Sequence, residues 1–390
     1  MKRFSSLILL VLYLFIGIYV LASSAYKPHH NWDMIMYIAA AKYYENQEIS
    51  SLHAFTYNAL QRSVPEPRYR VMIAGRYRHT VYTDPFSFNE QLPFYQIRPL
   101  YTGFIFLLYK MGVDIVFATH MVSGISVGIA LVILYFMSLS ILRHPFSYAV
   151  PFFALIFGIE NLARFSTPDG MAFMAIVLSA YLYLKNRIKL LSIFLPMVIC
   201  IRTDLILYVI PLLLIVALYK SESRKIATIS AVVSILFYFA VNTYSNNPGW
   251  PTIFYFTLVQ NLTHPLTMLP TLTVDHYLYA LFKGLKGIPG KSNFILYCLI
   301  SLYYLGVLVN RAKTTSLFYV LRSPAASLSI VCLFYVFSHF VLFPVALNRF
   351  FVGPYLMGAF SLLMMMTEYL KMGDTFQKND ARGGNSATLH

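Results

Sequence analysis

Charged side chains of the types needed for acid–base and anion-binding chemistry recur at the ends of long apolar segments in this chain. An unpaired ion beside a bilayer is costly, so charges gathered at one depth usually face one another or a water-filled cavity. We therefore expect one polar site at one membrane face, with ion-paired helix caps as the alternative. The set comprises Asp33, Arg98, Glu160, Arg164, Asp169, Arg202, Asp204 and Arg349.

Asp33 is the candidate general base. It follows the first apolar segment closely and leads a partly apolar stretch that runs to Glu45. A carboxylate held against an apolar phase is a stronger proton acceptor for an attacking hydroxyl, because desolvation disfavours its charged form. The alternative is that Asp33 only caps the helix that follows it.

Three arginines, Arg98, Arg202 and Arg349, are the candidate anion ligands. The planar fork of a guanidinium group matches the oxygens of a phosphate. The simpler alternative for Arg98 is an anchor at the membrane surface, and for Arg202 it is a local pair with Asp204. Likewise, Pro168-Asp169 is typical of the first turn of a helix.

Known cofactor motifs do not accompany these residues. The histidines form no HExxH or other metal-ligand spacing, and the sequence has no Walker loop, dinucleotide fingerprint or nucleophile elbow. We therefore predict no dedicated metal site and no firm cofactor, and leave a divalent cation open.

The composition places these charges in a membrane protein. Hydrophobic residues make up 58% of the 390 residues and charged residues only 12%, against about 25% in a soluble domain. The net charge of +15 would suit nucleic acid, but the basic residues form small loop clusters, which report membrane topology first. The cysteines, Cys200, Cys298 and Cys332, lie inside apolar segments and are predicted to pack there.

Apolar runs predict an all-α polytopic fold of about ten membrane-spanning helices, since about 20 helical residues cross the hydrocarbon core. Residues 99–109 are too short to span and are predicted to dip into the interface, and residues 202–204 are predicted to separate two short helices. We favour a retained first span over a cleaved signal peptide. The predicted spans cover residues 5–22, 115–142, 148–162, 170–184, 190–201, 205–219, 226–243, 293–309, 325–343 and 350–367.

An even number of spans places both termini on the same side of the membrane. We assign that side to the cytoplasm, because most Lys and Arg of the short loops then lie there as well. It leaves two long outer loops, 23–98 and 244–292, of which the first is polar and rich in Tyr and Arg. We treat residues 1–370 as one integral-membrane domain. Residues 371–390 are rich in polar side chains and are predicted to form a disordered tail.

Four short motifs form a pattern seen in a known enzyme family. They are Asp33 with Tyr37 and Ala40 after the first span, Arg98-Pro99-Leu100-Tyr101, Pro168-Asp169 opening a helix, and Arg202-Thr203-Asp204 between two short helices. Together they resemble the C-type polytopic membrane glycosyltransferases, which use polyprenyl-phosphate sugars as donors. The resemblance covers residues 1–370 as an arrangement. The chain departs from it in having no Asp-Glu pair in the first loop and no large C-terminal outer domain, which disfavours peptide acceptors.

The resemblance implies a glycosyltransferase of a bacterial inner (plasma) membrane, with its active site facing the periplasm or exterior. Its partners would be a polyprenyl-phosphate sugar donor, a lipid or glycan acceptor and the lipid bilayer, with no nucleic acid. Asp33 would be the base, and Arg98, Arg202 and Arg349 would hold the donor phosphate. A single displacement aided by one carboxylate base inverts the anomeric configuration. The substrate cavity would further include Tyr37, Tyr101, Glu160, Arg164, Asp169 and Asp204.

Two other classes share this hydropathy pattern. A transporter or flippase would also line a cavity with charges, but near the bilayer midplane and usually between internal repeats, which we do not find in the sequence. A polymerase or ligase of the O-antigen type would place its largest outer loop nearer the C-terminus, whereas the first outer loop is the largest here. These features favour the transferase.

Overall fold

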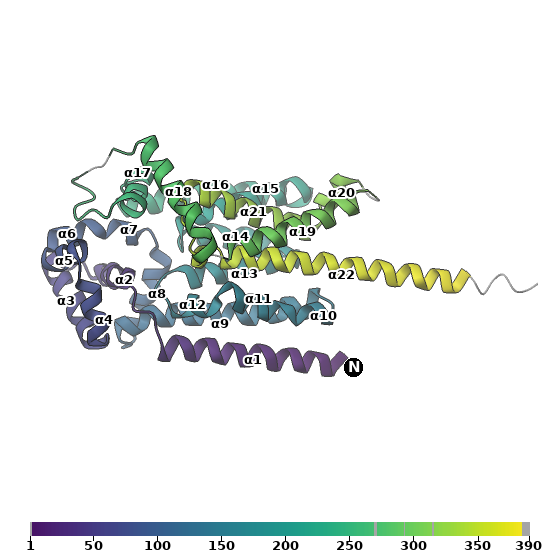
Figure 1. The fold of residues 1–390 in the computed structure, drawn as a ribbon, viewed down its shortest axis with the longest axis horizontal. Helices are drawn as coiled ribbons and strands as arrows, with labels where there is room; N and C mark the ends of the chain where they lie inside the picture. The colour runs from purple at the N-terminus through teal and green to yellow at the C-terminus, as the bar shows by residue number, and fades with distance from the viewer. Residues whose placement is uncertain (1, 269–270, 292, 314–315, 384–390) are drawn as a thin grey trace, which may run out of the picture.

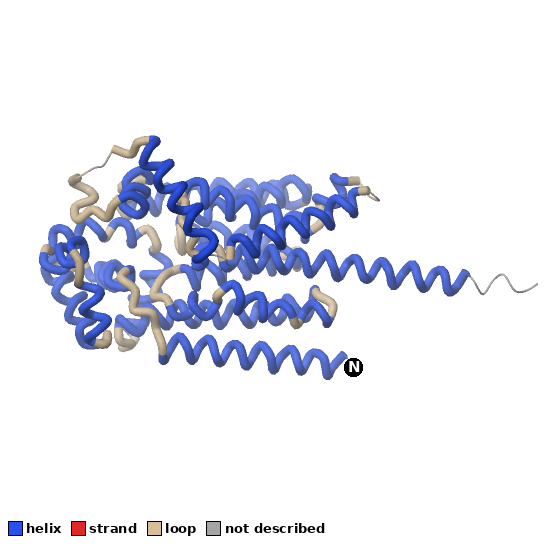
Figure 2. Tube along the Cα trace, viewed as in Figure 1, coloured by secondary structure: helices blue, strands red, loops and turns tan. Residues whose placement is uncertain are grey.

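The computed structural model describes residues 2–268, 271–291, 293–313 and 316–383, and helices form almost all of this part of the chain. The one β-type pairing in the described residues is an isolated bridge between His29 and Phe165. The loops connect one helix to the next (Figure 2). The predicted all-α class is therefore confirmed for the described residues.

The long helices form a bundle in which they run side by side (Figure 1). The beginning of α1 and the end of α22 lie at the same end of this bundle. The bundle comprises α1 (Lys2–Tyr26), α9 (Ile115–Ile141), α11 (Ala149–Phe157), α12 (Ile159–Arg164), α13 (Asp169–Leu184), α14 (Ile188–Ile199), α15 (Ile206–Tyr219), α16 (Arg224–Tyr244), α19 (Phe294–Ala312), α21 (Pro324–Leu342) and α22 (Val352–Gly383), with the short α10 (His144–Ser147) and α20 (Leu317–Leu321) between them.

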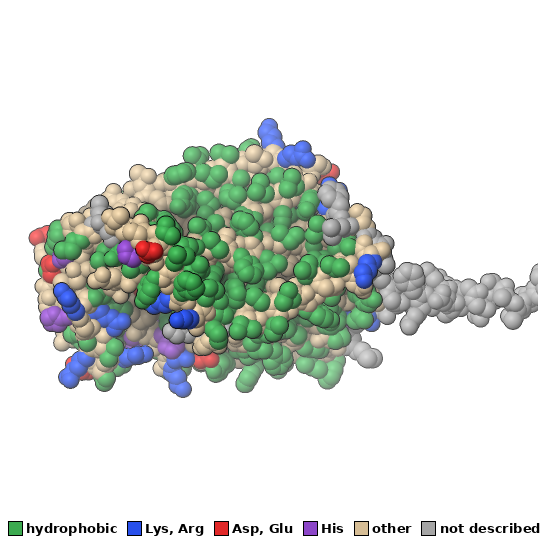
Figure 3. Space-filling model, turned by 45° about the horizontal axis from the view of Figure 1, so that its top comes forward, with side chains coloured by type: hydrophobic (Ala, Val, Ile, Leu, Met, Phe, Trp, Pro, Cys, Tyr) green, Lys and Arg blue, Asp and Glu red, His purple; other side chains and the backbone are tan. Residues whose placement is uncertain are grey.

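In the part of the chain that the structure describes, five helices are long and apolar enough to cross a membrane, and all five were predicted as spans. They are Phe4–Tyr26, Ile115–Ile141, Ser221–Tyr244, Phe294–Ala312 and Pro324–Leu342. Hydrophobic side chains cover the visible face of the bundle, while Lys and Arg gather towards its two ends (Figure 3). This distribution is that of a membrane-embedded protein. The full number of ten spans stays a prediction.

The helix boundaries differ from the expectation in two places. The predicted span 148–162 is broken at Gly158, whose φ of +94° ends α11 and lets α12 begin in a new direction. Helix α22 runs on to Gly383, where a disordered tail was predicted from residue 371, because Gln, Lys, Asp and Ala after Leu370 are compatible with a helix. Residues 384–390 of that predicted tail lie outside the described residues. The predicted break at residues 202–204 is present, since α14 ends at Ile199 and η2 (Thr203–Leu205) precedes α15.

A cap of short helices covers the end of the bundle opposite the two termini (Figure 1). Proline stands in the first turn of α4, α6, α7 and α17, where its fixed φ favours the start of a helix. The cap comprises α2 (Asp33–Lys42), η1 (Tyr43–Glu45), α3 (Ile49–Ser63), α4 (Glu66–Ile73), α5 (Arg76–Thr83), α6 (Pro85–Gln91), α7 (Pro93–Gln96), α17 (Trp250–Phe254) and the π-helix η4 (Tyr255–Val259). Helices α8 (Pro99–Lys110) and α18 (Val274–Lys291) connect the cap to the bundle.

Close packing between α13 and α9 sets the position of the first residues of α13. A Cβ atom on Gly170 would lie 2.9 Å from the backbone oxygen of Ser123, so only glycine allows the two helices to approach this far. Ser123 also donates a hydrogen bond to the carbonyl of Thr167 (2.9 Å). Asp169, which begins α13, is thereby held at the junction of bundle and cap.

Candidate functional site

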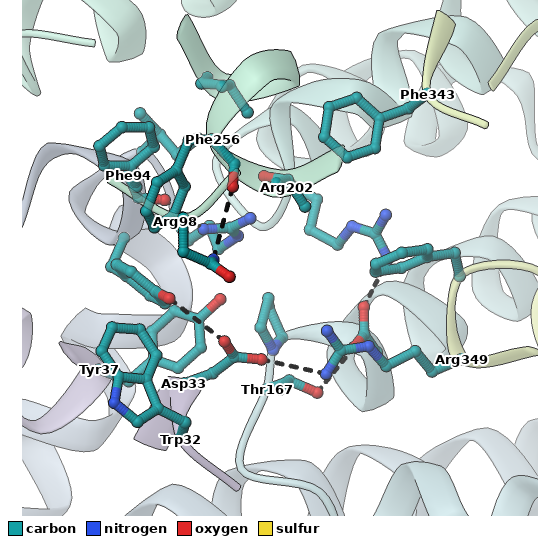
Figure 4. Close-up of a pocket in the computed structure, with 18 of the residues that line it drawn as sticks. Trp32, Asp33, Tyr37, Phe94, Arg98, Thr167, Arg202, Phe256, Phe343 and Arg349 are labelled. Carbon is teal, nitrogen blue, oxygen red and sulfur yellow. Dashed lines mark hydrogen bonds and ion pairs between the residues drawn. The ribbon is translucent and has the colours of Figure 1, made fainter. Parts of the chain in front are cut away.

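A cavity of about 350 Å³ lies between the cap and the ends of the bundle helices (Figure 4). Its walls come from α2, α5, α7, η4, the segment before α13, and the segment between α21 and α22. Aromatic side chains form much of the lining. The charged groups in the lining are Asp33, Asp169, Arg78, Arg98, Arg202 and Arg349. With four guanidinium groups and two carboxylates, the cavity favours an anionic ligand.

The linker between α1 and α2 brings Asp33 to this cavity. Its backbone pairs with the segment before α13: His29 N–H donates to the Arg164 carbonyl (2.8 Å), and Ser166 N–H donates to the Asn31 side chain (3.2 Å). Residues far apart in the sequence are joined here, so the beginnings of α2 and α13 lie at the same end of the bundle.

Asp33 is partly exposed, and its carboxylate is not used as a helix cap. It is the first residue of α2, while the N-cap position belongs to Trp32, which makes no side-chain cap bond. One carboxylate oxygen accepts a hydrogen bond from Tyr95 Oη (3.2 Å), and the other accepts from Arg349 Nη1 (3.2 Å). With 29% of its side chain exposed, Asp33 keeps access to a ligand in the cavity.

Asp169 differs from Asp33 because it is enclosed and fully engaged. Its side chain is only 3% exposed. It accepts hydrogen bonds from Arg202 Nη1 (2.6 Å) and from Thr167 Oγ1 (2.7 Å), and Arg349 Nε lies 3.6 Å from it. A carboxylate held in this way is suited to orienting arginines and is poorly placed to accept a further proton from a ligand.

Arg202 joins two carboxylates at the edge of the cavity. Its Nε and Nη2 donate to Asp204 at 3.1 and 2.6 Å, in the two-pronged geometry typical of strong arginine–carboxylate pairs. Burial opposes the charge of Arg202, but the carboxylates of Asp204 and Asp169 outweigh it and raise its pKa. The alternative that Arg202 only pairs locally with Asp204 is therefore incomplete, because Arg202 also pairs with Asp169.

Asp204 also contacts residues of α21, a helix that packs against α15. Tyr335 Oη donates to it at 3.1 Å, and His339 Nε2 lies 3.3 Å away. Burial alone would raise the pKa of Asp204, but Arg202 and His339 lower it well below its usual range. The carboxylate is thus held charged by Arg202, which precedes η2, and by His339 of α21.

Arg349 connects the exposed and enclosed carboxylates. It lies between Asp33 and Asp169, and its guanidinium stands 5.1 Å from the centre of the Phe350 ring. Burial acts against its charge, yet Asp33 and then Asp169 raise its pKa. Its Nε atom is buried without a hydrogen-bond partner in the structure, so one donor of this fork is not satisfied.

Arg98 is a lining arginine whose charge is not balanced by a carboxylate among the described residues, and Arg78 is another. The Arg98 Nη1 donates to the Phe94 carbonyl (2.6 Å), and the guanidinium lies 5.7 Å and 5.9 Å from the rings of Tyr37 and Tyr95. Among the described residues, no carboxylate lies within ion-pair distance of it. A cation stacked on aromatic rings without an anionic partner is well suited to bind an anion.

Four residues predicted to line the cavity lie elsewhere. Glu160 and Arg164 pair with each other at 3.2 Å, and Glu160 accepts from Tyr19 in α1, so this pair ties α12 to α1. Tyr101 is fully buried and donates to the Thr119 carbonyl (3.1 Å). Asp204 stands behind Arg202 and supports the cavity without lining it. The cavity does receive the predicted Asp33, Tyr37, Arg98, Asp169, Arg202 and Arg349.

Several residues of the site were not predicted. Asp33 is contacted by Tyr95, and Asp204 is contacted by Tyr335 and His339. These three residues lie in segments whose sequence is mainly apolar or aromatic. Arg78 enters the lining from the long first loop. The π-helix at Tyr255–Val259 contributes Phe256 and Thr257, and such irregular helices are frequent at functional sites.

The arrangement can support transfer of a group between an anionic leaving group and a hydroxyl. A partly exposed carboxylate can take a proton, and the arginines can stabilise the charge that departs. Among the residues that the structure describes, His, Cys, Asp and Glu form no group of three that could hold a metal ion. Comparisons with protein-family models, with curated proteins and with solved structures gave no match.

Proposed function

We propose that this protein is an inverting glycosyltransferase of a bacterial plasma membrane, which takes its sugar from a polyprenyl-phosphate donor at the outer face. The observation that supports this most is the pairing, in one cavity, of a partly exposed carboxylate at Asp33 with the uncompensated cation of Arg98. A lipid-phosphate donor brings its own leaving group, so the enzyme needs a base and cations and no nucleotide pocket.

The reaction follows from these two groups. The acceptor oxygen forms a bond to the anomeric carbon while the bond from that carbon to the phosphate oxygen breaks. The electron pair leaves with the phosphate, where Arg98 and Arg349 stabilise the new charge. The acceptor proton passes to Asp33. Attack from the side opposite the leaving group inverts the anomeric configuration.

Arg202 has a different role in this proposal from the one predicted. Three of its N–H groups already donate to Asp169 and Asp204, and its side chain is 5% exposed. We therefore propose that Arg202 positions Asp169, which in turn orients Arg349, and that Arg98 and Arg349 are the phosphate ligands.

The decisive experiment is to incubate the purified protein with a panel of polyprenyl-phosphate sugars and acceptor lipids or glycans. We expect release of polyprenyl phosphate with one donor, and a product of inverted configuration by NMR. A transporter or flippase would move a lipid-linked glycan across a proteoliposome without cleaving it. Transport without any sugar release would overturn the proposal.

Arg98→Lys is predicted to weaken binding of a lipid phosphate roughly tenfold. Lysine keeps the charge but loses the planar fork and the stacking on Tyr37 and Tyr95, and a charged hydrogen bond contributes about 1.5–3 kcal/mol. The measurement is titration calorimetry with a short-chain prenyl phosphate in detergent. Arg164→Lys is the control, because its guanidinium pairs with Glu160 away from the cavity. Equal affinity in Arg98→Lys, Arg98→Ala and the wild type would remove Arg98 from the donor site.

The proposed orientation makes a labelling prediction. On a background without the native cysteines, Gln61→Cys in the cap should react with a membrane-impermeant maleimide in intact cells. Ser221→Cys, at the opposite end of the bundle, should react only after permeabilisation. Both positions are exposed in the structure. The reverse pattern would place the cavity in the cytoplasm and contradict the proposed donor side.

A further inference from the structure

The cap presents an arginine surface, which we define as Arg62, Arg68, Arg70, Arg76 and Arg78 on helices α3 to α5. The first four are exposed, and Arg78 is half-buried. Lys and Arg side chains gather at this end of the molecule (Figure 3). The positive-inside rule does not account for the surface, because these residues lie in the loop assigned to the outer side.

The charge of this surface is largely uncompensated. Residues 49–84 contain only two carboxylates, Glu66 and Asp84. Glu66 pairs with Arg70 at 2.7 Å, and Asp84 caps α6 and lies 3.7 Å from His264. Among the described residues, no hydrogen-bond or ion-pair partner is seen for the guanidinium groups of Arg62, Arg68 or Arg76. Like charges in such proximity repel one another, so the surface does not serve the stability of the cap.

A repeated Arg-Tyr-Arg triplet gives the surface its form. In the first triplet Tyr69 is buried while Arg68 and Arg70 on either side are exposed. In the second triplet Tyr77 lies between Arg76 and Arg78, and its hydroxyl donates to Gln91 (3.1 Å). The tyrosines thus anchor the short helices α4 and α5, while Arg68, Arg70 and Arg76 stay exposed and Arg78 is half-buried.

The second triplet connects the surface to the cavity. Tyr77 and Arg78 both line the cavity, and the Tyr77 ring lies 5.3 Å from the ring of Trp32, the residue before Asp33. The arginine surface therefore ends beside the candidate base.

We propose that the acceptor is an anionic glycan, bearing carboxylate or phosphate groups, which docks on the arginine surface with a sugar ring against Tyr77 and Trp32. This rests on the proposed transferase function. The arginines attract and align the anionic groups, and the aromatic rings offer apolar faces to the sugar. Anionic lipid headgroups are the competing ligand, but they do not explain why the surface continues through Tyr77 and Arg78 into the cavity.

The experiment compares two pairs of cations at the outer end of the molecule. Arg68→Gln/Arg76→Gln removes two exposed arginines of the surface, and Lys283→Gln/Lys286→Gln removes two exposed lysines of α18. Each variant is placed in phosphatidylcholine nanodiscs. Binding is measured by fluorescence anisotropy with labelled polygalacturonate oligomers, phosphomannan oligosaccharides and neutral dextran.

We expect the wild type and the lysine variant to bind at least one anionic probe more tightly than dextran. The arginine variant should bind that probe roughly tenfold more weakly at low ionic strength, with a smaller difference as salt is added. Circular dichroism melting checks that the variants remain folded. Failure of the wild type to prefer either anionic probe, or equal binding by the arginine variant, would overturn the proposal.

Two further measurements separate the alternatives. If the arginine variant loses binding to phosphatidylglycerol vesicles but keeps wild-type binding of the glycans, the surface is a membrane contact and the proposal fails. Prenyl-phosphate titration of the same variant should give the wild-type affinity, because Arg98 and Arg349 are untouched. Failure of the wild type to bind the anionic glycans therefore disproves the acceptor assignment, whereas absence of any sugar transfer by the wild type disproves the proposed function.

Discussion

Asp33→Asn is expected to lower the rate of sugar transfer by about 10²–10⁴-fold while the protein still folds, because general-base catalysis typically contributes this much. Asparagine keeps an oxygen for the hydrogen bond from Tyr95, but it cannot take the acceptor proton. The lost ion pair with Arg349 is partly exposed, so its removal should cost about 1 kcal/mol or less. The measurement is transfer rate at saturating donor, alongside thermal unfolding in detergent.

Glu160→Gln provides a matched control. The Arg164–Glu160 pair has the same 3.2 Å separation as Arg349–Asp33, and its side chains are 21% and 29% exposed against 22% and 29%. Both variants remove one partly exposed carboxylate from an arginine at the same end of the bundle. Only Asp33 lines the cavity, so only Asp33→Asn should slow transfer. Wild-type turnover by Asp33→Asn would show that the base lies elsewhere.

The sequence predicted the elements of this fold better than their contacts. The long apolar helices at 115–141 and 324–342 were predictable, because a helix that faces lipid needs a long run of apolar residues, and such a run is recognised from composition alone. The interruption at residues 202–204 was also predictable, because two opposite charges inside one span would be costly. The break at Gly158 was not, since a single glycine in an apolar run does not reveal a left-handed φ.

The pairing of charges could not be predicted from the sequence. Arg349 and Asp33 are brought together only when the linker before α2 and the segment before α22 meet at one end of the bundle. Glu160 and Arg164, by contrast, stand one helical turn apart and satisfy each other locally. The predicted depth of a charged residue in the membrane therefore does not show whether the residue lines the cavity or pairs with a neighbour to hold two helices together.

Aromatic residues were the largest group that sequence reasoning missed. Tyr95 and Tyr335 resemble ordinary core tyrosines in the sequence, yet their hydroxyls donate to Asp33 and Asp204. A buried tyrosine hydroxyl needs a hydrogen-bond partner, and a carboxylate at the edge of the cavity can accept its hydrogen bond. Only the three-dimensional arrangement shows which tyrosine meets which carboxylate.

Arg202→Met is expected to destabilise the protein by about 3–5 kcal/mol, the range measured when one partner of a buried ion pair is removed. Asp169 is 3% exposed and would lose its closest donor, at 2.6 Å, while keeping only Thr167 and the more distant Arg349. The double variant Arg202→Met/Asp169→Asn should recover part of this loss, because it removes the unpaired charge.

Arg164→Met is the control. It removes one partner of a partly exposed pair, so it should cost about 1 kcal/mol or less. Thermal unfolding in detergent measures all three. If Arg202→Met is no less stable than Arg164→Met but fails to bind prenyl phosphate, Arg202 is a phosphate ligand and not the residue that positions Asp169.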